Sequence, residues 1–137
     1  MIEFHYEKEV VIPRVEDVQD WISNLIAEEE FRLDTISYIF CSDEDLVKRN
    51  IEFLKHDTLT DIISFDYTLG KLISGDIFIS VERVAENADQ FGVTFLDELH
   101  RVMAHGVLHY CGYSDKSDSE KKVMRGKEDY YLSLRKF

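Results

Sequence analysis

Alternating apolar and polar side chains predict four strands in this chain. Residues 2–6 and 35–41 alternate with the period of a strand that buries one face. Residues 61–67 and 72–80 are rich in β-branched and aromatic side chains and flank a glycine-containing turn, so we expect them to pair as a hairpin. Gly75, inside the last of these strands, indicates either a bulge or the close approach of another backbone.

Apolar residues three and four positions apart predict helices between these strands. The first helix is expected to have Pro13 at its first helical position and to run to the acidic residues 28–30. The second helix begins after the capping residue Ser42 and should stop near Lys55.

Capping residues predict three further helices in the second half of the chain. Ser80 caps the first of them, which Gly92 ends. Thr94 caps the next, and Ser117 with Glu120 forms the capping-box pattern of the last. The side chains expected on the buried face of this last helix are Val123, Met124, Tyr130, Tyr131 and Leu134.

The order of these elements predicts an α+β fold, with a small mixed four-stranded sheet packed with about five helices. The 137 residues are 45% hydrophobic and contain one proline, no repeat and no low-complexity run, so we expect a single domain over residues 1–137. Neither a membrane span nor a signal peptide is recognisable, which favours a cytoplasmic protein whose two cysteines are free thiols. The oligomeric state stays open.

The charge of the chain argues against sequence-independent binding of nucleic acid. Twenty-eight acidic and sixteen basic residues give a net charge of −12, which repels phosphate at long range. Residues 114–137 carry seven basic and five acidic side chains, a net +2, so the remainder carries −14. Most of the negative charge is explained by solubility, and an anionic substrate would have to be held by local cations.

Two histidines four residues apart, His105 and His109, provide the candidate chemistry. On a helix this spacing places both imidazoles on one face. Gly112 can end such a helix in the left-handed conformation, and Asp115 can then fold back toward the histidines. Two imidazoles and a carboxylate leave a fourth position of a zinc ion open for water, which is typical of catalytic zinc sites. Because the spacing is also that of the metzincin signature with aspartate in the final place, we predict a metal-dependent hydrolase with these three residues as metal ligands and catalytic residues.

Gly106 argues against a peptidase. Zinc peptidases of the His-Glu-x-x-His kind place the general base directly after the first histidine, where this chain has Gly106. A glycine at this position either lets a substrate or a strand approach the helix or makes a tight packing contact. The sequence leaves both interpretations open.

Three motifs in the same order carry a family resemblance. Residues 105–113 read His-Gly-Val-Leu-His-Tyr-Cys-Gly-Tyr, residues 60–65 read Thr-Asp-Ile-Ile-Ser-Phe, and residues 75–80 read Gly-Asp-Ile-Phe-Ile-Ser. They resemble the His-Gly-x-Leu-His-Leu-x-Gly-Tyr, Thr-Asp-Val-Leu-Ser-Phe and Gly-Asp-Ile-x-Ile-Ser segments of the YbeY family of rRNA maturation endoribonucleases. Asn50 resembles the asparagine of that family's preceding helix, and the match extends over about residues 46–128.

The resemblance implies a zinc-dependent endoribonuclease specific for single-stranded RNA, with a zinc-hydrolase-like fold. One Zn²⁺ per chain would be bound by His105, His109 and Asp115, and metal-activated water would attack a phosphodiester bond. The implied role is 3′-end maturation of small-subunit rRNA and ribosome quality control. The implied partners are therefore single-stranded RNA, above all rRNA, and the small ribosomal subunit.

Two departures from the family pattern concern charge. The family usually has a third histidine where this chain has Asp115, so the site loses one unit of positive charge, and either the acidity of bound water or the preferred metal changes. The family also usually has an arginine where this chain has Leu54, and Lys55 could bind phosphate there only as a point charge. His56 could contact substrate as well, although a loop histidine is more often solvated.

The remaining polar candidates have two interpretations each. His5 and His100 are expected to be structural or exposed, and Cys111 is expected to be an inert buried thiol rather than a metal ligand. Glu98 could orient a ligand or lie on a solvated helix face. A basic group near the C-terminus could bind RNA phosphates or only be solvated; it comprises Lys116, Lys121, Lys122 and Arg125.

Two other functions stay open. A metal-dependent peptidase is disfavoured by Gly106. In a ribosome-associated assembly factor the metal would mainly stabilise the fold, and the acidic surface would prefer basic ribosomal proteins to naked RNA.

Overall fold

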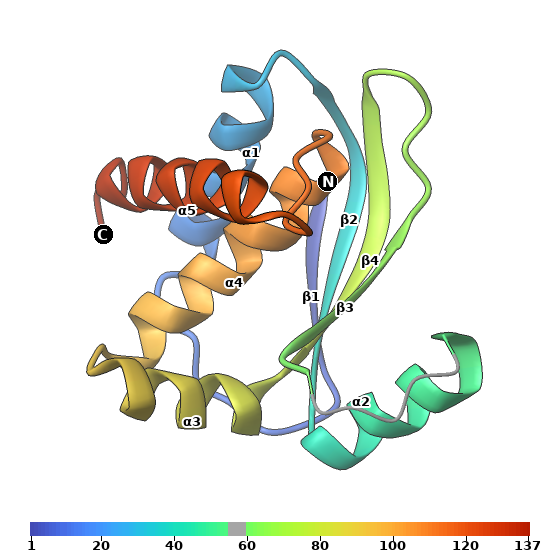
Figure 1. The fold of residues 1–137 in the computed structure, drawn as a ribbon, viewed down its shortest axis with the longest axis vertical. Coiled ribbons are helices and arrows are strands. Elements are labelled where there is room, and N and C mark those ends of the chain that lie inside the picture. The colour runs from blue at the N-terminus through green and yellow to red at the C-terminus, as the bar shows by residue number, and fades with distance from the viewer. Residues whose placement is uncertain (55–59) are drawn as a thin grey trace.

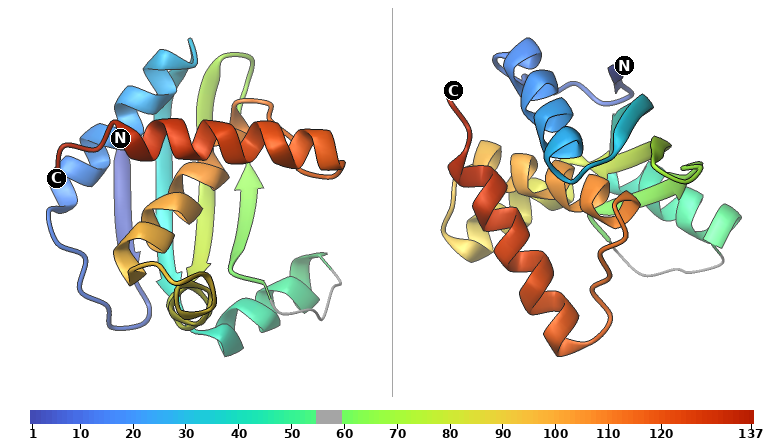
Figure 2. Two further views of the ribbon diagram at one scale, coloured as in Figure 1. Left: turned by 60° about the vertical axis from the view of Figure 1, so that its left-hand side comes forward. Right: turned by 90° about the horizontal axis from the view of Figure 1, so that it is seen from above.

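Helices cover one face of a four-stranded sheet in this computed structural model, which describes residues 1–54 and 60–137 (Figure 1). Helix α1, Val15–Glu28, and helix α4, Phe95–Tyr110, lie against that face. Helix α5, Asp118–Ser133, crosses α4 on the side away from the sheet (Figure 2). Helix α4 is therefore held between the sheet and α5.

The sheet is mixed and has the order β1-β2-β4-β3. Strand β1, Ile2–Tyr6, is parallel to β2, Arg32–Cys41, which is in turn parallel to β4, Leu72–Ser80. Strand β3, Ile62–Asp66, pairs antiparallel with β4. The predicted α+β class, the mixed sheet and the hairpin are confirmed.

Strand β2 begins at Arg32, three residues before the predicted start at residue 35. Its pairing with β4 shifts register between Leu33 and Thr35, and this irregularity interrupts the alternation from which the strand was predicted. The bulge in the sheet thus lies in β2 and not at Gly75.

Gly75 marks a close approach instead. A Cβ atom on it would lie 2.6 Å from the carbonyl oxygen of Phe65 and 2.6 Å from the ring of Tyr110. The Tyr110 hydroxyl lies 3.0 Å from the carbonyl oxygens of both Phe65 and Asp76. Only a residue without a side chain leaves room for α4 to reach the β3–β4 pair in this way.

Helix α1 begins at Val15, so the prediction that Pro13 occupies the first helical position is wrong. Arg14 lies in the left-handed conformation, with φ 58° and ψ 47°, and this backbone geometry separates Pro13 from the helix. The helix ends at Glu28, at the start of the predicted acidic run.

Helix α2, Asp43–Arg49, is shorter than predicted. Its cap is as expected, because the Ser42 side chain accepts a hydrogen bond from the backbone N–H of Asp45 at 3.1 Å. A π-helical segment, Asn50–Leu54, replaces the α-helix where the pattern predicted that it would continue. Lys55, the predicted end, lies outside the described residues.

Helix α3, Val81–Phe91, begins at the predicted cap Ser80 and ends at Gly92, which has a φ of 68°. Both halves of the capping box at Ser117 are present on α5. Of the side chains predicted to be buried on α5, however, only Met124 and Tyr131 are buried. Helix α5 packs mainly on α4 along a narrow stripe, and the exposed members of the predicted set are Val123, Tyr130 and Leu134.

Buried polar groups connect the layers of the core. The Tyr38 hydroxyl of β2 donates to the backbone oxygen of Met103 in α4 at 2.9 Å. The indole N–H of Trp21 in α1 donates to the backbone oxygen of Tyr131 in α5 at 2.8 Å. These bonds fix α4 relative to the sheet and α5 relative to α1.

Among the described residues, no helix is long and apolar enough to cross a membrane.

Candidate metal centre

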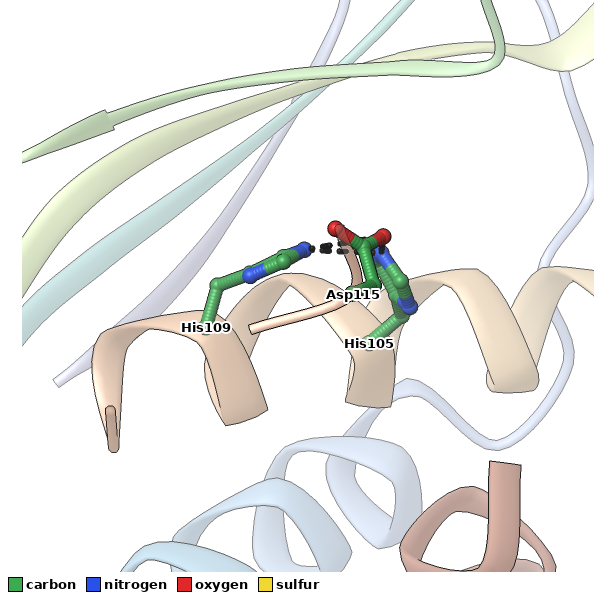
Figure 3. Close-up of side chains that lie close together, drawn as sticks. All are labelled: His105, His109 and Asp115. Carbon is green, nitrogen blue, oxygen red and sulfur yellow. Dashed lines mark hydrogen bonds and ion pairs between the residues drawn. The ribbon is translucent and has the colours of Figure 1, made fainter. Parts of the chain in front are cut away.

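Three predicted side chains converge on one point above α4 (Figure 3). His105 and His109 lie on successive turns of the helix, and their Nε2 atoms are 2.9 Å apart. Gly112 adopts a φ of 97° directly after the helix, which turns the chain so that Asp115 comes back. One carboxylate oxygen of Asp115, Oδ2, lies 3.3 Å from Nε2 of His105 and 3.5 Å from Nε2 of His109.

The other nitrogen of each imidazole has a partner of its own. His109 Nδ1 lies 2.9 Å from the backbone oxygen of Tyr113, which can only accept a hydrogen bond, so Nδ1 carries the proton. His105 Nδ1 lies 2.7 Å from a carboxylate oxygen of Glu128 on α5 and donates to it. In the neutral form of each ring, Nε2 is then an unprotonated ligand atom.

This arrangement fits a divalent metal ion. Two imidazole lone pairs and a carboxylate oxygen face one another, and three acceptors so close together are stabilised by a proton or a metal ion between them. For a tetrahedral zinc ion with ligands at 2.0–2.1 Å, adjacent ligand atoms would be about 3.3 Å apart. The observed separations of 2.9, 3.3 and 3.5 Å bracket that value.

Glu128 is the least expected member of the site. It is only 4% exposed, and it accepts hydrogen bonds from both His105 and Arg101, the latter at 2.9 Å. Burial alone would lower the pKa of His105, but the hydrogen bond and the charge of Glu128, together with Asp115, outweigh burial and raise that pKa above its ordinary value. A carboxylate behind a ligating imidazole fixes the ring and increases its basicity.

A cavity of about 340 Å³ opens beside the ligands. His105 and Asp115 form one part of its lining, and α5 forms another. Asp61 and Glu98 also line it, and burial is the main cause that raises the pKa of each carboxyl group. The cavity is therefore a hollow of mixed charge that includes two of the candidate ligands, His105 and Asp115, in its lining.

Comparison with known proteins identifies the family. The family model described as Endoribonuclease YbeY matches residues 2–135. The chain belongs to this family. It is 57% identical to the Endoribonuclease YbeY of Flavobacterium johnsoniae over 134 residues, which cover 98% of this chain and 96% of the relative. It is 47% identical to that of Bacteroides thetaiotaomicron over 119 residues, or 87% of each chain.

A solved structure agrees with this assignment. The solution structure of TM1509 from Thermotoga maritima matches with a TM-score of 0.72 and 26% sequence identity, over 97% of this chain and 87% of that one. The fold is thus shared over nearly the whole of this chain.

The other predicted site residues of this YbeY chain fall in different places. His100 is buried and His5 is exposed, paired with Glu3 at 3.0 Å. Cys111 is half-buried, and burial raises the pKa of its thiol to about 12, so it is an inert thiol at neutral pH. Lys55 and His56 lie outside the described residues.

Glu98 and Gly106 each resolve one of the open alternatives. Glu98 is buried and lines the cavity, so the solvated-face interpretation is wrong, but the hydrogen bond to a ligand comes from Glu128 instead. At Gly106, a Cβ atom would lie 3.0 Å from the Cδ1 atoms of both Ile62 and Ile77. Gly106 therefore makes a tight packing contact with the sheet.

Glu128 was not singled out by the sequence patterns, although a signal was present. Met124, Glu128 and Tyr131 are spaced by four and three residues along the buried stripe of α5. An acidic side chain in an otherwise apolar stripe requires a buried partner.

Proposed function

We propose that this chain is a zinc-dependent endoribonuclease specific for single-stranded RNA, with the metal ion bound by His105, His109 and Asp115. The observation that carries the proposal is the convergence of three ligand atoms within 4.8 Å in a chain of the Endoribonuclease YbeY family. The three ligands lie beside a cavity that is large enough to admit part of a substrate. We place this activity in one domain over residues 1–137.

A zinc ion in this position would supply Lewis acidity at the phosphate and a water molecule acidified toward about pKa 7. The protein contributes the orientation of the ligands. Glu128 and the backbone oxygen of Tyr113 hold the protons of both imidazoles on Nδ1, so that both Nε2 atoms face Asp115. Both rings are thus positioned before any metal or substrate arrives.

Asp115 gives this site a harder and more negative ligand than the histidine usual in the family. An anionic oxygen ligand would lower the net charge of the loaded site by one unit relative to a neutral imidazole, and water at the ion would be less acidified. It also favours metals that accept oxygen ligands, such as Mn²⁺, more than a third imidazole would. We retain zinc as the proposed metal because two of the three ligands are imidazoles.

The proposed biological role is 3′-end maturation of small-subunit rRNA and ribosome quality control in the cytoplasm, with the small ribosomal subunit as partner. Family membership supports this role. A chain with a net charge of −12 does not attract free RNA over long distances. The proposed role therefore requires that the RNA be brought to the enzyme, for example on the small ribosomal subunit.

The test is cleavage of single-stranded RNA by wild-type protein beside His105→Ala, with the metal content of both samples measured. Wild type is expected to contain one zinc ion per chain, to lose activity on chelation and to recover it with zinc, whereas the variant should lack both metal and activity. Cleavage that persists in the presence of chelator would indicate a contaminating nuclease and count against the proposal.

The assembly-factor alternative predicts a different result from the same samples. The ligands connect α4, the following loop and, through Glu128, α5, so metal removal would also lower the thermal stability. If ribosome binding were kept and cleavage were never observed with fully loaded protein, the metal would be structural and the enzymatic proposal would be wrong.

A further inference from the structure

The cavity beside the candidate ligands is also lined by three cationic side chains. Helix α5 contributes Lys121 and Arg125 to its lining, and α4 contributes Arg101. The acidic groups in the lining, besides Asp115, are Asp61, Glu98 on α4 and Glu128 on α5.

The three cations differ in what they already bind. The Arg101 guanidinium is engaged by Glu128 at 2.9 Å and by Asp129 at 2.6 Å. Arg125 is 58% exposed, and the nearest carboxylate oxygen, on Glu128, is 4.0 Å away. Among residues 1–54 and 60–137, no carboxylate forms an ion pair with the Lys121 ammonium. Lys121 and Arg125 therefore remain available for an external anion.

The acidic groups in the lining repel an anion less strongly than the same number of exposed, unpaired carboxylates would. Glu128 is already bound by the Arg101 guanidinium and accepts a hydrogen bond from Nδ1 of His105. Burial raises the pKa of Asp61, and burial together with the charge of Asp61 raises that of Glu98, so these two groups ionise less readily than exposed carboxyls. A metal ion at the ligands would add two positive charges at the end of the same cavity.

The helical spacing separates Lys121 and Arg125 from their basic neighbours. They are four residues apart on α5 and thus on one face, the face that lines the cavity. Lys122 lies one position further along the helix, about 100° away, and neither it nor Lys116 is part of the lining. The basic group that the sequence presents as a set of four is thus divided into two cavity residues and two surface residues.

We propose that Lys121 and Arg125 bind backbone phosphates of single-stranded RNA adjacent to the phosphate at His105, His109 and Asp115. The strand then runs from the metal ligands along the first turns of α5, and the two side chains bind it without reading its sequence. This inference rests on the proposed function, because the RNA substrate comes from it. It also explains how a chain of net charge −12 can hold RNA at one place.

The test compares Lys121→Gln and Arg125→Gln with Lys122→Gln, which removes the same charge from the same helix at a position outside the cavity. Binding of a short, single-stranded, fluorescently labelled oligouridylate to zinc-loaded protein is measured by anisotropy from about 50 to about 200 mM salt. The oligonucleotide is examined on a denaturing gel after each titration, and the zinc content and thermal midpoint of every variant are compared with those of wild type.

Each cavity variant should weaken binding about 3- to 10-fold at the low-salt end and reduce the slope of log Kd against log salt by about 0.7, the value of one phosphate contact on a single strand. Lys122→Gln should change neither quantity appreciably, and Arg125→Lys should retain part of the binding. Equal weakening by all three glutamine variants would mean diffuse electrostatics and overturn the proposal, as would unchanged binding by the two cavity variants.

Failure of this inference can be distinguished from failure of the proposed function. If wild type binds RNA through Lys121 and Arg125 but never cleaves it, the phosphate site stands and the enzymatic proposal falls. If wild type cleaves RNA and both cavity variants bind and cleave normally, the enzymatic proposal stands and the phosphate site is wrong.

Discussion

Two histidines on α4, the buried His100 and the half-buried His105, have opposite electrostatic environments. His100 packs against the rings of Trp21 and Phe137, and the Arg135 guanidinium donates to its Nδ1 at 2.8 Å. Burial, and then the charge of Arg135, lower its pKa from 6.5 to about 4. At His105 the carboxylates of Glu128 and Asp115 overcome burial and raise the pKa.

The difference shows that burial alone does not make a histidine a ligand. Five residues separate the two, about 140° around the helix, so His100 faces α1 and the C-terminal segment while His105 faces the cavity. A cation next to His100 keeps that imidazole neutral and structural. Anions next to His105 favour a positive charge at the ring, and a proton or a metal ion can provide it.

The largest expected effect comes from replacing a histidine of the candidate metal centre, with a substitution of His100 as the comparison. His109→Ala should lose stoichiometric zinc and all metal-dependent RNA cleavage, because two ligands do not hold the ion in a site of this kind. His100→Gln should keep both, since it touches neither ligand. Metal content by atomic emission and cleavage of single-stranded RNA are the measurements. Full zinc in His109→Ala would show that the ligand set is different.

The next effect is the contribution of His100 to stability in acid. Its pKa in the folded protein lies below its value in an unfolded chain, so the unfolded state binds the proton more readily. The stabilisation is therefore complete above about pH 6.5 and is lost as the pH falls toward 4, by about 3 kcal/mol in total. Urea unfolding of wild type and His100→Gln at several pH values measures it.

Carboxylates also titrate in this range, so the difference between the two proteins is the informative quantity. His100→Gln should lose less stability than wild type between neutral pH and pH 4.5, by about 2–3 kcal/mol. Equal losses in the two proteins would mean that His100 is not the group responsible.

A smaller effect, on zinc affinity, distinguishes Glu128 from Glu98, the two buried glutamates of the cavity. Glu128→Gln removes the charge behind His105 but leaves an amide oxygen that can still accept from Nδ1, so zinc affinity should fall about 10-fold, the lower end of the range for such partners. Glu98→Gln has the same change in charge in the same cavity without a hydrogen bond to a ligand, and should leave the affinity unchanged. Competition with a chromophoric chelator measures both, and equal affinities in the two variants would remove Glu128 from the site.

These residues also show how far the sequence determines the site. His105, His109 and Asp115 lie within eleven residues of one another, on one helix and the turn after it, so local geometry alone brings them together. Glu128 reaches His105 only because α5 folds back over α4. That crossing depends on tertiary packing, which no local spacing specifies.

Element boundaries follow the same rule. The caps at Ser42, Ser80 and Ser117 are local interactions and lie where the sequence predicted them. Pro13 failed as a helix start because Arg14 takes a left-handed backbone conformation, which arginine rarely adopts. Strand β2 begins early because its first residues pair with β4, a contact made across forty positions of sequence.

The smallest expected effect concerns Gly106, on the face of α4 that packs on the sheet. Alanine there gains about 1 kcal/mol of helix propensity but places a methyl group 3.0 Å from two isoleucine Cδ1 atoms, and such overpacking costs about 1–3 kcal/mol. Since the ends of Ile62 and Ile77 can rotate, the net destabilisation should be about 1 kcal/mol or less. Gly126→Ala on α5 is the control, because its Cβ would meet nothing within 4 Å and should stabilise the protein by up to about 1 kcal/mol.

Chemical denaturation of both variants, together with RNA cleavage, tests this packing role of Gly106. A packing role requires that Gly106→Ala lose stability relative to Gly126→Ala while its zinc affinity and KM stay at wild-type values. If Gly106→Ala is as stable as wild type but has a raised KM, the glycine serves the approach of substrate. That result would contradict the packing contact that Gly106 makes with Ile62 and Ile77 on the sheet.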